Sequence, residues 1–91
     1  MLEDRYTVVF RRDGKFYVAL CLELNVSSQG ESLEEAKENI ADAIHEYLSY
    51  MQENDLLGEI HPVPFEILRE FLLEGLEDTE SAGMEVWAVA A

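Results

Sequence analysis

The sequence predicts an α+β fold, in the order β-β-β-α-(α)-β, with one long helix packed on one face of an antiparallel sheet. Three observations predict it. Apolar residues alternate over 6–20 around Gly14, a long helical apolar pattern follows Ser32, and an apolar segment closes the chain at 84–91. We therefore expect a two-layer sandwich of three antiparallel strands, a late C-terminal strand and the covering helix, in a single domain over residues 1–91.

The first two strands, which begin at Tyr6 and Phe16, should form a hairpin. A two-residue turn ending at Gly14 would pair Phe10 with Tyr17, whereas a three-residue loop ending at a left-handed Gly14 would pair Phe10 with Phe16. We favour the three-residue loop, because it collects the apolar side chains of both strands on one face. That face would comprise Tyr6, Val8, Phe10, Phe16, Val18 and Leu20.

A third strand is expected from Glu23 to Ser28, and Gly30 should break it. The long helix should start at Ser32, an N-cap residue that forms a capping box with Glu35. It should end at Asn54-Asp55. Its apolar stripe recurs at spacings of three and four, as helical packing requires, and comprises Leu33, Ala36, Ile40, Ile44, Tyr47, Leu48 and Met51.

Residues 55–83 are interpreted as a connector, a short helix and an acidic loop. The apolar spacing favours a helix over 65–73 that Gly75 ends, while a strand over 65–68 stays open. The residues that set this spacing are Phe65, Leu68, Phe71 and Leu72. A last strand is expected at 84–90.

Charge is the strongest functional signal, because the chain holds 20 acidic and 6 basic residues and a net charge of −14. Such a surface repels phosphates, so we expect no direct nucleic-acid binding by the isolated chain. The same field favours a basic protein partner. Four of the basic residues surround the hairpin and are interpreted as protecting its edge and turn. They are Arg5, Arg11, Arg12 and Lys15.

Nothing in the sequence predicts catalysis, and no cofactor or metal is expected. His45 and His61 are far apart, and His45 falls on the polar side of the long helix, where solvent should surround it. Cys21, the single cysteine, should pack as a small apolar residue and suits a reducing cytoplasm. We also expect neither a signal peptide nor a membrane-spanning segment.

A series of segments carries a family resemblance. They are Tyr6-Thr7-Val8-Val9-Phe10, Asp13-Gly14-Lys15-Phe16-Tyr17-Val18-Ala19, Glu23-Leu24, Ser28-Gln29-Gly30-Glu31-Ser32-Leu33-Glu34-Glu35-Ala36-Lys37-Glu38-Asn39-Ile40, Ala43-Ile44 and Tyr47-Leu48. In this order, from residue 6 to about residue 50, they resemble the HicB-like antitoxin family. The segment from Gln29 to Ala36, placed between a strand and a helix, is the most specific part.

The resemblance implies a partly formed ribonuclease H-like fold, a dimer or larger assembly, and inhibition of a small, basic, mRNA-cleaving toxin of the HicA-like kind. It does not extend to the basic DNA-binding modules that some relatives carry after this region. The first strand also lacks the carboxylates of an active ribonuclease H.

These observations predict a non-enzymatic, cytoplasmic, antitoxin-like protein. The alternative is a standalone homo-oligomeric module that has a regulatory or small-molecule-binding role and no toxin. The favoured partner-binding residues are Glu74, Glu77, Asp78 and Glu80. The helix carboxylates could instead contribute, or only solubilise and cap; they are Glu34, Glu35, Glu38, Asp42 and Glu46. The expected oligomer interface lies at Met84, Val86, Trp87 and Val89.

Overall fold

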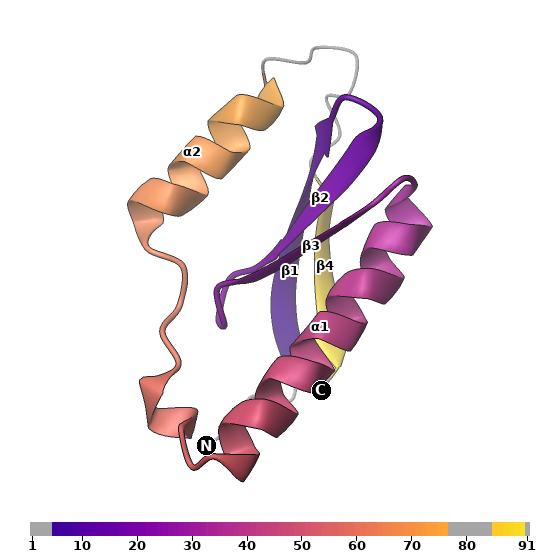
Figure 1. Cartoon of the computed structure of the whole chain (residues 1–91). Helices are drawn as coiled ribbons and strands as arrows, with labels where there is room; N and C mark the ends of the chain where they lie inside the picture. Colours follow the sequence, from indigo (N-terminus) through magenta and orange to yellow (C-terminus); the bar gives the residue numbers. More distant parts are fainter. Residues whose placement is uncertain (1–4, 77–84, 91) are drawn as a thin grey trace.

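A computed structural model describes residues 5–76 and 85–90 of the chain and has the predicted α+β class (Figure 1). Three antiparallel strands are followed by a long helix. The elements are β1 (Arg5–Asp13), β2 (Phe16–Cys21), β3 (Val26–Gly30), α1 (Leu33–Glu53), the short 3₁₀ helix η1 (Leu57–Glu59), α2 (Phe65–Leu76) and β4 (Glu85–Ala90).

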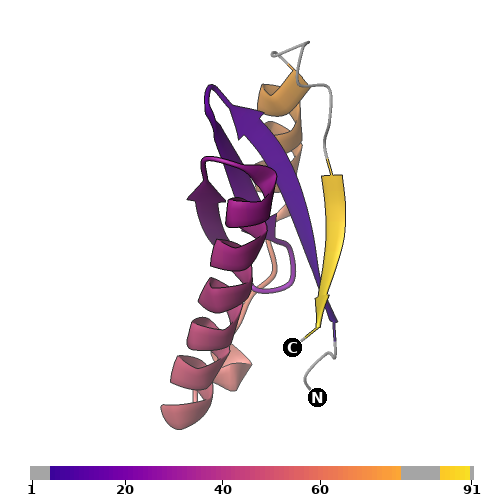
Figure 2. The same cartoon turned by 90° about the vertical axis from the view of Figure 1, so that its right-hand side faces the viewer.

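The strands lie in the order β3-β2-β1-β4, and each neighbouring pair is antiparallel. Figure 2 shows β4 beside β1 at one edge of the sheet, and β3 forms the other edge. α1 crosses one face of this sheet, and α2 lies against the opposite face (Figure 1). The predicted two-layer arrangement is therefore incomplete, because α2 adds a partial third layer.

Each face of the sheet has its own apolar core. The larger core lies under α1, where Val8, Phe10, Ile40 and Ile44 are almost fully buried. The smaller core lies under α2 and joins Val9, Leu20 and Phe71. Successive residues of a strand point to opposite faces, so Val8 and Val9 serve different cores.

The hairpin register expected from the sequence is wrong. Phe10 pairs with Ala19, and Asp13 pairs with Phe16, so the loop is the two residues Gly14 and Lys15. Gly14 has φ +63, the backbone conformation that a tight hairpin turn takes from glycine. The expectation failed because it assumed one covered face, whereas Val18 and Leu20 pack under α2 on the other.

The third strand also begins later than expected. Residues 22–25 form a turn, in which Asn25 takes φ 56, and β3 then runs from Val26 to Gly30. Gly30 lies against the first turn of α1, since a Cβ added there would sit 2.5 Å from the backbone nitrogen of Ala36. β3 therefore passes directly into α1 at a contact that a larger residue would obstruct.

The start of α1 confirms Ser32 as the N-cap, but the return bond of the expected capping box comes from Glu31 and not from Ser32. The Ser32 hydroxyl oxygen accepts a hydrogen bond from the backbone N–H of Glu35 at 3.1 Å. The Glu35 carboxylate accepts one from the backbone N–H of Glu31 at 2.9 Å. The helix ends at Glu53, with Asn54 as its C-cap, as the sequence predicts. Most of the predicted apolar stripe is buried or half-buried against the sheet.

The segment from Phe65 is a helix, which settles the alternative left open by the sequence. Leu68, Phe71 and Leu72 face the smaller core. One expectation was wrong, because Gly75 does not end the helix, which continues to Leu76. Phe65 is 74% exposed, since α2 meets the sheet through its middle turns.

Candidate protein-binding surface

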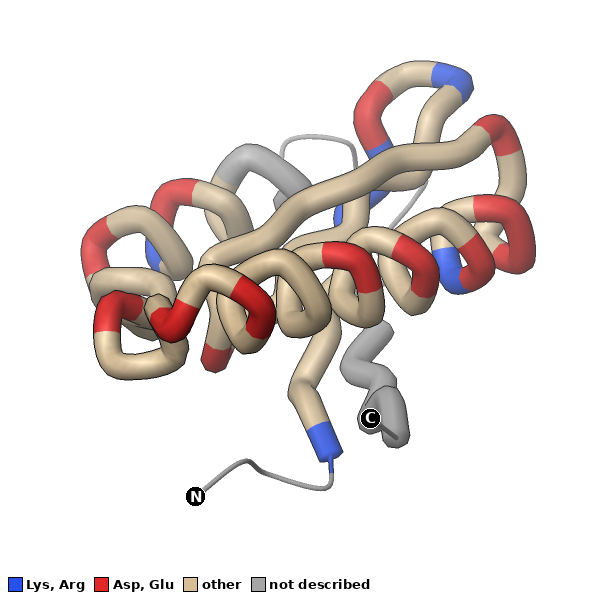
Figure 3. The backbone as a smooth tube through the Cα atoms, turned by 60° about the horizontal axis from the view of Figure 1, so that its bottom comes forward, with Lys and Arg blue, Asp and Glu red and all other residues tan. Residues whose placement is uncertain are grey.

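The outer side of α1 carries a row of carboxylates along its whole length, shown in red in Figure 3. The members of this row, called here the α1 acidic row, are Glu35, Glu38, Asp42, Glu46 and Glu53, and all are exposed. They occur on one side because the opposite side of the helix holds its buried stripe, and helical residues three or four apart share a face. The row is thus fixed on a rigid element.

The electrostatics of this row are unfavourable within the chain. Glu38 and Asp42 are like charges four residues apart, and Asp42 repeats this relationship with Glu46. Such pairs destabilise a helix by about 0.2–0.5 kcal/mol each. Lys37, the basic residue of α1, lies half-buried on the flank of the helix and not in the row. A cationic partner would relieve this repulsion.

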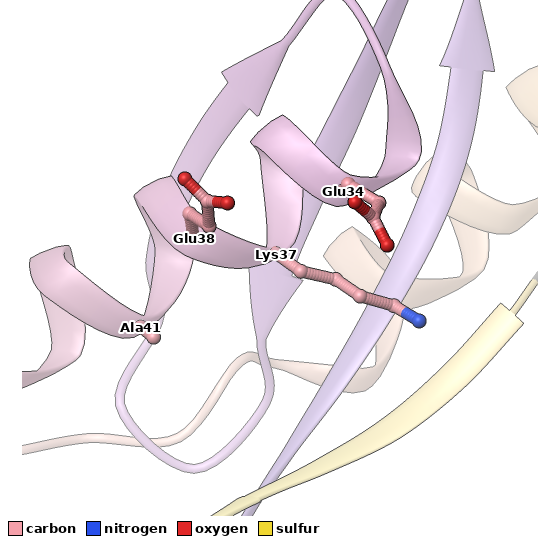
Figure 4. Close-up of a pocket in the computed structure, with 4 residues that line it drawn as sticks. All are labelled: Glu34, Lys37, Glu38 and Ala41. Atoms are coloured by element: carbon pink, nitrogen blue, oxygen red, sulfur yellow. The ribbon is translucent and has the colours of Figure 1, made fainter.

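A shallow hollow adjoins the row near the start of α1. Its volume is about 320 Å³, and Glu34, Lys37, Glu38 and Ala41 line it. Figure 4 shows Glu34 and Glu38 on successive turns, with the Lys37 side chain extending away from the helix between them. Three of these four residues are charged, but most of the surface that they present to the hollow is apolar, as the stems of long charged side chains are.

The opposite sign of charge is concentrated at the β1–β2 hairpin. Each cation there lies over an aromatic ring: Arg11 is 4.6 Å from the ring centroid of Phe71, Arg12 is 5.9 Å from that of Tyr17, and Lys15 is 5.6 Å from that of Phe16. Arg11 also lies 3.7 Å from Asp13. The edge protection expected of these cations is wrong for β1 and β2, because both are inner strands of the sheet. The contact of Arg11 with Phe71 instead joins β1 to α2.

The described residues offer little for catalysis. No group of three or more His, Cys, Asp or Glu side chains within 5–76 and 85–90 is arranged to hold a metal ion. Cys21 is fully buried in the larger core, as predicted, and burial raises the pKa of its thiol. His45 is exposed, also as predicted. None of the helices in the described part of the chain is long and apolar enough to cross a bilayer.

The predicted partner-binding tail is only partly placed. Glu74 falls within α2, and Glu77, Asp78 and Glu80 lie outside the described residues. Of the predicted oligomer interface, Met84 also lies outside them. The other three positions are in β4, where Val86 pairs with Val9, Trp87 with Val8 and Val89 with Tyr6.

Sequence reasoning missed one surface feature, the apolar residues on the exposed side of α2. Phe65, Ile67 and Leu73 are 74%, 48% and 44% exposed. The available signal was that apolar residues of this segment occur on more than one side of the helix, a pattern typical of helices that are covered on more than one side.

No family model matches the chain, and neither a curated protein nor a solved structure is significantly similar to it.

Proposed function

We propose that this protein is a non-enzymatic, antitoxin-like inhibitor that binds a small, basic, mRNA-cleaving toxin. The observation that carries the proposal is the α1 acidic row, five exposed carboxylates on one ordered helix face. A toxin that binds RNA must present cations to the RNA phosphates, and a cationic surface of this kind is complementary in charge to the α1 acidic row. The resemblance of residues 6 to about 50 to the HicB-like family, with its ribonuclease H-like fold, supports the same function.

The row would act mainly on association and partner choice. Exposed ion pairs contribute about 0–1 kcal/mol each, so the affinity must come from apolar contacts that the row surrounds or adjoins. The acidic tail formed by Glu74, Glu77, Asp78 and Glu80 is the second proposed arm of this surface. A segment of this composition can bind along a basic groove, although ordering the segment costs conformational free energy.

The decisive experiment pairs the chain with the short basic protein encoded next to it. The two proteins should copurify, and the chain should suppress RNA cleavage by its partner. If no basic protein is encoded next to the chain, or if that protein neither copurifies with the chain nor is inhibited by it, the toxin is removed from the proposal and the standalone module is favoured.

Matched variants assign the contact to α1. Glu38→Gln/Asp42→Asn removes two charges from the row, and Asp55→Asn/Glu59→Gln removes the same two residue types from exposed positions beyond the helix. At low salt the first variant should slow association by roughly two- to fivefold and the second should barely change it. Equal effects would show that net charge acts, and not the row.

The tail needs its own variant. Neutralising Glu74, Glu77, Asp78 and Glu80 together should slow association and weaken its salt dependence, while the melting temperature stays nearly constant. An unchanged association rate at low salt would exclude the tail as a steering surface and leave the row as the sole acidic arm.

The proposal also excludes ribonuclease activity by this chain. β1 presents no carboxylate between Arg5 and Phe10, where a ribonuclease H-like site would begin. Labelled RNA should stay intact with Mg²⁺ or Mn²⁺. Cleavage that disappears when one carboxylate is replaced would show that the protein is an enzyme.

Finally, we propose that the protein is a cytoplasmic homodimer or larger assembly, and that its C-terminal segment, which contains β4, is a stable fourth strand of the sheet. Paired to β1, β4 is an edge strand, and an edge can add to the sheet of a second copy. The interface would lie at Met84, Val86, Trp87 and Val89. Deletion of residues 84–91 should then reduce the assembly state, provided that the shortened protein folds.

A further inference from the structure

β3 is an edge strand that lacks the usual protection of an edge. Its inner side pairs with β2, from Tyr17–Gly30 to Cys21–Val26. Among the strands that the structure describes, none lies beyond β3 in the sheet. Its residues include neither proline nor a charged side chain, which are common means of keeping an edge from pairing. The sequence of β3 therefore does not prevent a further strand from joining it.

The backbone groups of Ser27 and Gln29 point outward from this edge. Residue pairs of antiparallel strands alternate between hydrogen-bonded and non-hydrogen-bonded ones, and a two-residue turn is closed by a hydrogen-bonded pair. Asp13–Phe16 is that pair in the β1–β2 hairpin, so Tyr17, the next residue of β2, directs its N–H and C=O to β3. The same alternation along β3 leaves the N–H and C=O of Ser27 and Gln29 on the outer side. Both residues are exposed.

Side chains of α1 agree with this direction and occupy one end of the edge. The Asn39 side-chain amide donates to the Gln29 carbonyl oxygen at 2.8 Å. The Glu35 carboxylate accepts a hydrogen bond from the Glu31 N–H, the next outward group along the chain. Within the described residues, the Ser27 N–H and C=O and the Gln29 N–H are the groups that an added segment can bind. Such a segment would end beside Asn39.

Three carboxylates of the α1 acidic row lie on the flank of the helix that borders this edge. Asn39 marks the flank, because its side chain reaches the outer side of β3. Helical periodicity puts the residues four before Asn39, and three and seven after it, on the same flank. These residues are Glu35, Asp42 and Glu46, and all are exposed. A segment added to β3 would therefore run beside negative charge.

The pleat of the sheet decides which side chains of an added segment would meet that charge. Ser28 lies on the α1 side of the sheet, between Val26, which packs on the larger core, and Gly30, which contacts α1. A residue opposite Ser28 in the added segment would share that side, as would every second residue of the segment. The site thus fits an extended segment with lysine or arginine at alternate positions.

Charge argues against a second copy of this chain as the occupant. Two copies paired antiparallel through β3 would form one continuous sheet with both α1 helices on the same face, which brings their acidic rows together. The net charge of −14 makes this approach repulsive. A basic segment would instead reduce the like-charge repulsion within the row.

From these observations we infer that the β3 edge is a strand-addition site for an extended, basic segment of the partner protein. Main-chain hydrogen bonds to Ser27 and Gln29 anchor the segment, and the carboxylates beside the edge select its alternating cations. The inference rests on the proposed function for the identity of the partner, and it specifies which part of that partner the chain binds.

Hydrogen exchange of the full chain, alone and in complex with the basic protein encoded next to it, tests the inference residue by residue. Binding should slow exchange of the Ser27 and Gln29 amides by roughly tenfold or more, because each gains a main-chain acceptor. The Ser28 amide, which faces β2, is the internal control and should change less. Exchange that slows at neither Ser27 nor Gln29, in a complex that does form, would overturn the inference and leave the proposed function standing.

A proline variant removes the outward donor. Ser27→Pro deletes the Ser27 N–H and keeps the hydrogen bonds between β3 and β2, since edge strands accept proline where the N–H faces solvent. It should raise the dissociation constant of the complex by roughly tenfold or more. Ser27→Ala keeps the N–H and is the matched control, with an affinity close to that of the wild type. Equal affinities of the two variants, both with the wild-type circular dichroism spectrum, would contradict strand addition.

Two synthetic peptides test the edge without a toxin and without any change to the chain. Lys-Val-Lys-Val-Lys-Val-Lys should shift the NMR signals of the Ser27 and Gln29 amides. Lys-Pro-Lys-Pro-Lys-Pro-Lys carries the same charge but pairs poorly as a strand, so it should shift them much less. Equal shifts would show that charge alone acts and would overturn the inference. If the neighbouring protein does not bind but the valine peptide is preferred, the proposed function is wrong and the strand-addition site is supported.

Discussion

The carboxylate of Glu23 binds Thr7 twice. One oxygen accepts a hydrogen bond from the Thr7 backbone N–H at 2.7 Å, and the other accepts one from the Thr7 hydroxyl at 2.8 Å. Next to this contact, the Leu22 backbone N–H donates to the Thr7 carbonyl oxygen at 2.9 Å. The side chain of Glu23 thus supplies the acceptor that the β1–β2 ladder loses where the chain turns toward β3.

Replacing this carboxylate should be costly. Glu23→Ala leaves a part-buried amide and hydroxyl without their acceptors, so the free energy of unfolding should fall by about 1–3 kcal/mol. Urea denaturation measures it. Glu59→Ala, at an exposed position, should change the same quantity by less than about 0.5 kcal/mol. Equal losses in the two variants would contradict a structural role for the contact.

Glycines 30 and 58 should respond oppositely to alanine. A Cβ at Gly30 would meet the backbone of Glu35 and Ala36 at 2.8 and 2.5 Å, and backbone atoms cannot move aside as a side chain can. Gly30→Ala should therefore lower the free energy of unfolding by about 1–3 kcal/mol. A Cβ at Gly58 meets nothing within 4 Å, so Gly58→Ala should be neutral or stabilising, by up to about 1 kcal/mol.

The same thermal or urea denaturation series measures both variants. A Gly30→Ala protein as stable as Gly58→Ala would mean that β3 and α1 can separate at their junction without loss.

The α1 helix could be predicted from the sequence because its signals are local. Ser32 and Glu35 are three residues apart, and the buried stripe repeats within the helix itself. The register of the β1–β2 hairpin could not be predicted, because it depends on which elements cover each face of the sheet. Val18 and Leu20 are apolar in either register, and α2, which lies more than 40 residues further along the chain, decides that they face away from Phe10.

The candidate surfaces also include one part that could be predicted from local sequence and one part that could not. The exposed carboxylates of α1 follow from helical periodicity, so their place could be predicted. The exposure of Phe65 could not, since its spacing to Leu68 and Phe71 matches a buried stripe equally well. Which turns of α2 touch the sheet is set by the connector, where the Val63 backbone N–H donates to the Leu22 carbonyl oxygen at 2.8 Å.

The acidic row should reduce the stability of the free protein. Asp42→Asn is nearly isosteric and removes two like-charge pairs, with Glu38 and with Glu46, so it should stabilise the fold by about 0.4–1 kcal/mol at low salt. Salt screens exposed charges, so the gain should shrink at high ionic strength. Urea denaturation at both salt concentrations measures it. A loss of stability at low salt would show that Asp42 has a favourable contact in the fold.

The buried thiol of Cys21 should make stability fall at alkaline pH. Burial, and secondarily the negative charge of Glu23, raise the pKa of Cys21 above its ordinary value of 9.0, and the Sγ atom lies 3.9 Å from a Glu23 oxygen. Below that ordinary value both the folded and the unfolded chain hold the proton, so the stabilisation is complete. Above it the unfolded chain loses the proton first, and the free energy of unfolding falls as pH rises toward the folded pKa.

The slope of this loss can reach about 1.4 kcal/mol per pH unit for one group. Cys21→Ala should be less stable at neutral pH, because a small cavity replaces the thiol, but its stability should fall less steeply above pH 9.0 than that of the wild type. All other side chains are the same in the two proteins, so the difference in slope belongs to the thiol. Urea denaturation between neutral and alkaline pH gives the two slopes. Parallel curves would show that the Cys21 pKa is the same in the folded and unfolded chains.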